Sequence, residues 1–175
     1  MRRARWGEPH DVPDALDVEG RIVRALVLAT DALVAGRDAT ADARAAVEIA
    51  ATHGWGVREC EARLLLAEAL LVGGEPRRAL AEARNVARKA STMTSRRFES
   101  EARALVALID EPPIDAAELE ELAMAENVSP RASRRARSLL GDVSAPLDVA
   151  DEGVLAAGRA RAAVEVLRVR AESPD

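Results

Sequence analysis

Residues able to carry out chemistry are scarce in this chain of 175 residues, which has one cysteine, two histidines and no tyrosine. Cys60 and His53 could supply a nucleophile with a base, or two ligands of a metal site. A zinc site needs about four ligands, and a catalytic dyad needs a third group that orients the base. No residue at recognisable spacing supplies either requirement. The sequence therefore predicts a protein that is not an enzyme, with no metal site and no cofactor.

Trp55 is the aromatic residue with the clearest candidate role, because it lies between Gly54 and Gly56. These glycines allow a tight turn, so the indole is expected to cover the seam between two neighbouring helix pairs. The alternative is an exposed aromatic contact for a partner, since tryptophan often dominates interface energies. Both interpretations remain open at this point.

A run of arginines is the strongest charge pattern, and it consists of Arg131, Arg134, Arg135 and Arg137. Spacings of three and four place the first three on adjacent parts of one helix face, where they could hold a phosphate or an acidic partner. The preceding helix, however, carries Glu118, Glu120, Glu121 and Glu126. Internal salt bridges across this helical hairpin are therefore favoured over an anion site. The net charge of −5 also disfavours nucleic-acid binding.

The elements that position these residues are helices, because apolar residues recur with helical periodicity and no segment alternates as a strand would. The fold class is therefore all-α. Helices are expected at 18–35, 40–53, 57–72, 76–90, 96–109, 116–127, 130–140 and 147–171. One compact domain is predicted, divided into a loose N-terminal segment at 1–17, helical repeats at 18–111, a helical hairpin at 114–141 and a long capping helix at 147–171.

An internal repeat organises the first two thirds of the chain. The segment Glu59–Leu66 recurs as Glu99–Val106 at a spacing of about 40 residues, which is in the range of helical-repeat arrays. A second match relates Leu28–Gly36 to Leu66–Gly74 at a spacing of about 38. Each helix pair can bury only part of its apolar surface, so neighbouring pairs must cover one another as in a solenoid.

The pattern Leu66-Ala67-x-x-Leu70, followed by Ala79 and Ala83, resembles the tetratricopeptide repeat. In that family, small residues on both helices let the two backbones approach closely, and Ala67 and Ala79 have the corresponding spacing. The resemblance is best over 58–91, weaker over 20–57 and 95–109, and absent beyond 113. It implies antiparallel helix pairs stacked as a short right-handed solenoid, as in divergent arrays of large bacterial regulatory proteins.

This sequence departs from the tetratricopeptide pattern at the large aromatic residue near the start of the first helix, where Arg63 and Arg103 stand. The resemblance also implies a partner-binding inner face. Its positions in this chain are Glu61, Leu64, Glu68 and Leu71, with Glu101, Ala104 and Leu108 one unit later. Such an acidic and aliphatic groove suits an amphipathic helix or an Arg-rich segment. Alternatively, the hairpin and the last helix fill the groove internally.

These observations together predict a non-catalytic protein–protein interaction module, a scaffold or adaptor with a regulatory role. Its expected partner is another protein, or a copy of itself if the helix at 147–171 is a homodimerisation element. A nucleic-acid-associated regulator is the least favoured alternative. The lone cysteine and the lack of an apolar stretch after the first arginines favour a cytoplasmic location without a membrane segment.

Overall fold

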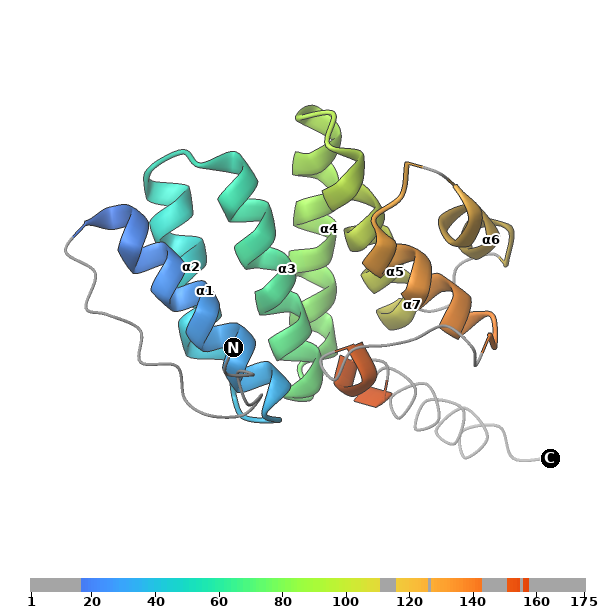
Figure 1. Ribbon diagram of the computed structural model, residues 1–175, viewed down its shortest axis with the longest axis horizontal. Helices are drawn as coiled ribbons and strands as arrows, with labels where there is room; N and C mark the ends of the chain where they lie inside the picture. Colours follow the sequence, from blue (N-terminus) through green and yellow to red (C-terminus); the bar gives the residue numbers. More distant parts are fainter. Residues whose placement is uncertain (1–16, 111–115, 126, 143–150, 155, 158–175) are drawn as a thin grey trace, which may run out of the picture.

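The computed structural model describes residues 17–110, 116–125, 127–142, 151–154 and 156–157 (Figure 1). These residues form helices and turns, with no strand among them, so the all-α prediction is confirmed. The helices are α1 (Val18–Val34), α2 (Thr40–Thr52), α3 (Gly56–Val72), α4 (Pro76–Thr92), α5 (Arg96–Ile109), α6 (Ala116–Met124) and α7 (Pro130–Leu139). Residues 151–154 are also helical.

The first four helices all end in the same backbone motif. Each is followed by a residue with positive φ, namely Gly36, Gly54, Gly74 and Thr94. The next residue donates its amide hydrogen to a carbonyl five residues earlier, as Glu75 does to Leu70 at 2.8 Å. This Schellman motif satisfies carbonyl groups that the helix end leaves without partners. The chain therefore reverses sharply after each helix, and consecutive helices pack side by side.

The first five helices form two layers. α3 contacts both α1 and α5, so these three helices share one layer (Figure 1). α2 packs against α1 and α3, while α4 packs against α3 and α5. The layer of α1, α3 and α5 has one face turned towards α2 and α4. Its opposite face, called the inner face below, is the one on which α7 packs through α5.

Alanine dominates the core of these layers. Ten alanines of the main core are completely buried: Ala29, Ala43, Ala46, Ala50, Ala62, Ala67, Ala79, Ala83, Ala90 and Ala102. A side chain of one methyl group lets neighbouring helix backbones approach closely, so the seams are narrow and sensitive to added volume. Ala67 and Ala79, singled out by their spacing in the sequence, both belong to this core.

The C-terminal part adds a second, smaller core. Ala104 of α5 is buried together with Leu122 of α6 and with Ala132 and Ala136 of α7. The α6–α7 hairpin thereby closes over the end of the array. The loose segment predicted at 1–17 lies outside the described residues except for its last residue. The long helix predicted at 147–171 is described at 151–154 and 156–157, where Val154 joins the main core.

Candidate functional site

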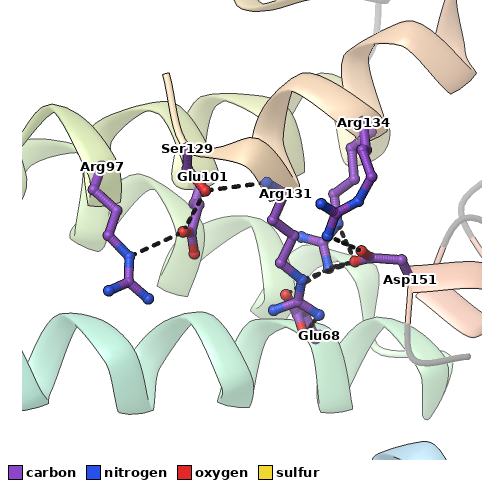
Figure 2. A network of polar contacts seen from close by, with 8 residues as sticks. Glu68, Arg97, Glu101, Ser129, Arg131, Arg134 and Asp151 are labelled. Carbon is purple, nitrogen blue, oxygen red and sulfur yellow. Dashed lines mark hydrogen bonds and ion pairs between the residues drawn. The ribbon is translucent and has the colours of Figure 1, made fainter. Parts of the chain in front are cut away.

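A cluster of buried charges connects α7 to α3 (Figure 2). Arg135 of α7 is 1% exposed and contacts Glu68 of α3, which is also 1% exposed, and the fully buried Asp151. Its Nη2 donates to Glu68 Oε1 at 2.7 Å, and its Nε donates to Asp151 Oδ1 at 2.8 Å. Arg131, one turn earlier, donates to Glu68 Oε2 at 3.0 Å and to Asp151 Oδ1 at 2.8 Å. Two arginines thus hold two carboxylates from distant parts of the sequence.

The start of α7 is fixed by a second set of polar contacts, this time with α5. Ser129 is the N-cap, and its Oγ accepts a hydrogen bond from the amide of Arg131 at 3.3 Å. The same hydroxyl donates to Glu101 Oε1 at 2.7 Å, while the Ser129 amide donates to Ser100 Oγ at 3.1 Å. Arg131 and Arg135 are four residues apart, so their side chains lie on the same face of α7. The cap and both arginines therefore contact the inner face together.

Burying charges is costly unless every charge is paired, because ions lose their hydration in the interior. Glu68, Arg135 and Asp151 satisfy this condition through one another and through Arg131. Removing any one member leaves the others in a poorly hydrated site. The cluster therefore fixes the position of α7 on the inner face.

The arginine run forms internal salt bridges, but its described partners are not the glutamates of the acidic helix, as the sequence had predicted. Glu118 and Glu121 of the acidic helix pair with Arg103 of α5, at 2.7 and 3.2 Å. The hairpin packs through the apolar cluster of Leu122, Ala132 and Ala136, which turns the arginine face of α7 towards α3. Arg134 lies at 3.8 Å from Asp151, and Arg137 pairs with Asp142 at 2.8 Å. Glu120 is exposed, and Glu126 lies outside the described residues.

Most of the predicted partner-binding residues are buried within the protein itself. Leu64, Glu68, Leu71, Glu101, Ala104 and Leu108 are all at least nine-tenths buried. Glu68 and Glu101 are hydrogen-bonded to α7 or its cap, and Ala104 packs in the same cluster as the α7 alanines. Of the two alternatives, internal filling is therefore what the structure has between α3 and α5. This part of the inner face is called the occupied seat below.

Glu61 and Trp55 have a different environment. Glu61 is partly exposed and pairs with Arg58 at 2.8 Å. Both residues border a groove of about 540 Å³ between α1 and α3, whose other lining residues are Val23, Leu26, Val27, Thr30 and Asp31. Trp55 lines a smaller hollow of about 250 Å³ with Glu19, Ile22, Val23 and Arg58. The two hollows share Val23 and Arg58, so together they form one surface, the α1–α3 groove.

The residues considered for chemistry lie apart from this groove or play a packing role. Cys60 is completely buried, and burial raises the pKa of its thiol. His53 is exposed and stacks on Trp55, with ring centroids 5.2 Å apart. Within the described ranges, no group of three or more His, Cys, Asp and Glu side chains could hold a metal ion. The half-buried Trp55 packs its ring against the main core, at the edge of the groove.

Arg63 and Arg103 perform similar tasks at equivalent positions of the repeat. Arg63 of α3 donates to Glu59 at 2.9 Å and to Glu82 of α4 at 2.6 Å, and Lys89 of α4 also donates to Glu59. Burial opposes the ionisation of Glu59, but the hydrogen bonds from Lys89 and Arg63 outweigh it and lower the pKa of this carboxyl. Arg103 of α5 reaches the next helix in the same way, through Glu118. An ion pair thus stands where the tetratricopeptide pattern has an aromatic residue.

Asp151 was missed by the sequence analysis, and so was the specific pairing of Glu68. Glu68 carried a usable signal, since it is a single carboxylate within a run of apolar residues on α3. Such a residue is buried only when a cation reaches it. No comparable signal marks Asp151, because its partners are set by how the C-terminal segment packs.

No protein-family model, curated protein or solved structure matches this chain. Among the described residues, no helix is both long enough and apolar enough to cross a membrane. What the protein does must therefore be inferred from its own residues.

Proposed function

We propose that this protein is a non-catalytic protein–protein interaction module, built as a divergent tetratricopeptide-like solenoid and acting as a scaffold or adaptor in a regulatory system. The repeat at about 38 to 40 residues supports the proposal, because helix ends with positive φ recur at Gly36 and Gly74 and at Gly54 and Thr94. The two layers of helices also support it, since stacked pairs leave one face of the odd-numbered helices for contacts.

The observation that carries the proposal is the contrast between the two halves of the inner face. Between α3 and α5 this face binds a helix, which is α7 of the same chain. Between α1 and α3 no described helix packs on this face, and Val23 in the α1–α3 groove is 45% exposed. An exposed apolar groove rimmed by charged residues is typical of a site for another protein.

The role of the arginine run also bears on function. Arg131 and Arg135, which could have held a phosphate backbone, are engaged by Glu68 and Asp151. A nucleic acid would have to compete with these buried carboxylates. Among the residues that the structure describes, no segment packs in the α1–α3 groove as α7 packs on the occupied seat.

Site-specific photocrosslinking in the native host tests the proposal. A photoreactive amino acid at Val23, inside the groove, is expected to capture a specific protein. The matched control places it at Val57, which is 60% exposed on α3 and does not line the groove. Equal capture from both positions, or none from Val23, would contradict a docking function for this groove.

A further inference from the structure

The contact between α7 and the occupied seat is made largely by charged side chains (Figure 2). Glu68 of α3 and Glu101 of α5 are at least nine-tenths buried beneath it. Among the described residues, both cations that contact Glu68 belong to α7, namely Arg131 at 3.0 Å and Arg135 at 2.7 Å. Glu101 accepts the hydrogen bond from the cap of α7 at 2.7 Å. The seat therefore supplies carboxylates, and α7 supplies the donors.

The α6–α7 hairpin has an apolar core of its own, which keeps its two helices together. Leu122 of α6 is completely buried in one cluster with Ala132 and Ala136 of α7. The array contributes Ala104 of α5 to this cluster, and Leu139 of α7 packs on the main core. The hairpin can therefore leave the seat as one unit, because few apolar contacts attach it to the array.

Opening such a contact costs less free energy than opening an apolar contact of the same size. The carboxylates and guanidiniums lose their hydration when the hairpin docks and regain it when the hairpin leaves, so the loss of the ion pairs is largely offset. Polar interfaces of this kind are typical of parts of one chain that move relative to each other. Release of the hairpin therefore exposes the seat without unfolding α1 to α5.

Asp151, the third carboxylate of the cluster, lies on the array side of the contact. Val154, three residues later, is completely buried in the main core and attaches this segment to the array. Glu101 also pairs with Arg97 at 3.3 Å, and the Arg97 side chain is 67% exposed. The seat thus brings carboxylates from three segments to one surface, which an occupant with basic side chains complements.

α7 itself shows which kind of segment the seat accepts. Its hydroxyl cap, Ser129, contacts Glu101, and its two arginines, at positions two and six after the cap, contact Glu68. Residues four positions apart lie on the same face of a helix. The ligand class is therefore a short helix with a hydroxyl N-cap and basic residues two and six positions after it.

We propose that the α6–α7 hairpin is a reversible, autoinhibitory cover of the occupied seat, and that its release opens a site for a helix of this class on a partner protein. While α7 is docked, its effective concentration of about 1 mM keeps the site closed to such a helix. This site is separate from the α1–α3 groove, so the inference goes beyond the proposed function and does not depend on it.

Thiol labelling of the folded full chain tests whether the cover opens. Ser100→Cys places a thiol beneath α7, because Ser100 is buried and accepts a hydrogen bond from the Ser129 amide at 3.1 Å. Cys60, completely buried in the main core, is the internal control that reports unfolding of the array. The thiol at position 100 should react at least about a hundredfold faster than Cys60. Equal rates would mean that the hairpin leaves only when the array unfolds, and would overturn the proposal.

Two methionine variants show whether α7 is what protects this thiol. Arg135→Met weakens the contact with Glu68 and should accelerate labelling at position 100 at least about tenfold. Arg134→Met should change the rate at most about twofold, because the Arg134 side chain is 31% exposed. Equal rates in the two variants would contradict a cover held by buried charges.

A fluorescent peptide of residues 127–142, which contains the cap and both arginines, tests what the seat accepts. It should bind full-length Arg135→Met at least about tenfold more tightly than the parent, because the cover of the variant is weakened. A peptide with Arg131→Glu and Arg135→Glu should bind the variant at least about tenfold more weakly than the unchanged peptide. Ser129→Ala, which removes the cap hydroxyl and loosens α7 less, is a second protein variant and should change the affinity in the same direction. Equal affinity for parent and variants, or no binding to the variants, would overturn the proposal.

One further outcome concerns the identity of the occupant. If the full chain forms a dimer in which the hairpins are exchanged between copies, the occupant is a second copy, and the assignment to a partner protein is wrong. Failure of these tests leaves the proposed function standing, because crosslinking at Val23 examines a different surface.

Discussion

Replacing Arg135 by methionine should destabilise the protein strongly, because this arginine is the central cation of the buried charge cluster. Its guanidinium contacts Glu68 at 2.7 Å and Asp151 at 2.7 and 2.8 Å. Methionine keeps much of the side-chain length and removes the charge. The two carboxylates then remain in a site from which water is largely excluded, and each loses its contacts with Arg135.

The size of the effect follows from what remains. Breaking a buried ion pair by removing one partner costs about 3 to 5 kcal/mol. Arg131 still reaches both carboxylates, which places the expected loss near the lower limit, at about 3 kcal/mol. Domains are stable by roughly 5 to 15 kcal/mol, so the variant should still fold. With a urea dependence of about 2 kcal/mol per molar, the unfolding midpoint should fall by about 1.5 M.

Arg134 provides the matched control, because it is the adjacent residue and carries the same charge. Its side chain is 31% exposed and lies 3.8 Å from Asp151. Arg134→Met should therefore cost less than about 1 kcal/mol, as exposed pairs do. In urea melts, the double variant Glu68→Leu with Arg135→Met should recover part of the loss, since it removes one of the two carboxylates that Arg135→Met leaves buried, and Arg131 still pairs with the other, Asp151. Equal effects of the two methionine variants would refute the argument that burial of Arg135 fixes α7.

Three other predictions concern the array itself. Thr94 holds φ at +52° where the preceding helix ends have glycine, so Thr94→Gly should raise stability by about 0.5 to 1 kcal/mol. Gly74→Thr should lower the free energy of unfolding by about 1 to 2 kcal/mol through backbone strain alone, because a Cβ there meets open space. Thermal melts measure both changes. Ala67→Leu or Ala79→Leu should cost about 1 to 3 kcal/mol in urea melts by overpacking a narrow seam; two neutral variants would argue against the seam. Glu59→Gln should destabilise at neutral pH, where the Glu59 carboxylate with its lowered pKa is charged. The difference from the parent should vanish as the pH falls through that pKa, which urea melts at a series of pH values from 7 downwards would measure.

The helices were predictable because residues close to each helix end determine where the helix stops. Gly36, Gly54 and Gly74 each stand where a left-handed backbone conformation ends a helix, and Pro76 opens the next helix. The predicted bounds of the first five helices differ from the observed ones by at most two residues. Thr94 lies in the gap between the helices predicted at 76–90 and 96–109, but a β-branched residue gives no indication of positive φ.

The contacts of α7 were not predictable in the same way, because they depend on packing between distant segments. Arg135 and Glu68 are separated by 67 residues. The sequence showed that Arg131 and Arg135 share a helix face. It did not show whether that face contacts the acidic helix α6 or the inner face of the array. In the structure, Leu122 of α6 packs on the side of α7 formed by Ala132 and Ala136, so the arginine side of α7 contacts the inner face. The periodicity of one helix does not indicate which of the two surfaces its arginine face contacts.

The tethering of α7 also determines which seat a partner can use. A segment joined to its binding surface by a short connection competes at an effective concentration of about 1 mM. A partner helix present at about 1 μM, with the same intrinsic affinity as α7, would then occupy the seat at Glu68 and Glu101 roughly a thousandfold less often than α7 does. The α1–α3 groove carries no such competitor among the described residues, and Val23 there is exposed. The partner helix of the proposed function is therefore expected at the α1–α3 groove, and not at the occupied seat that α7 covers.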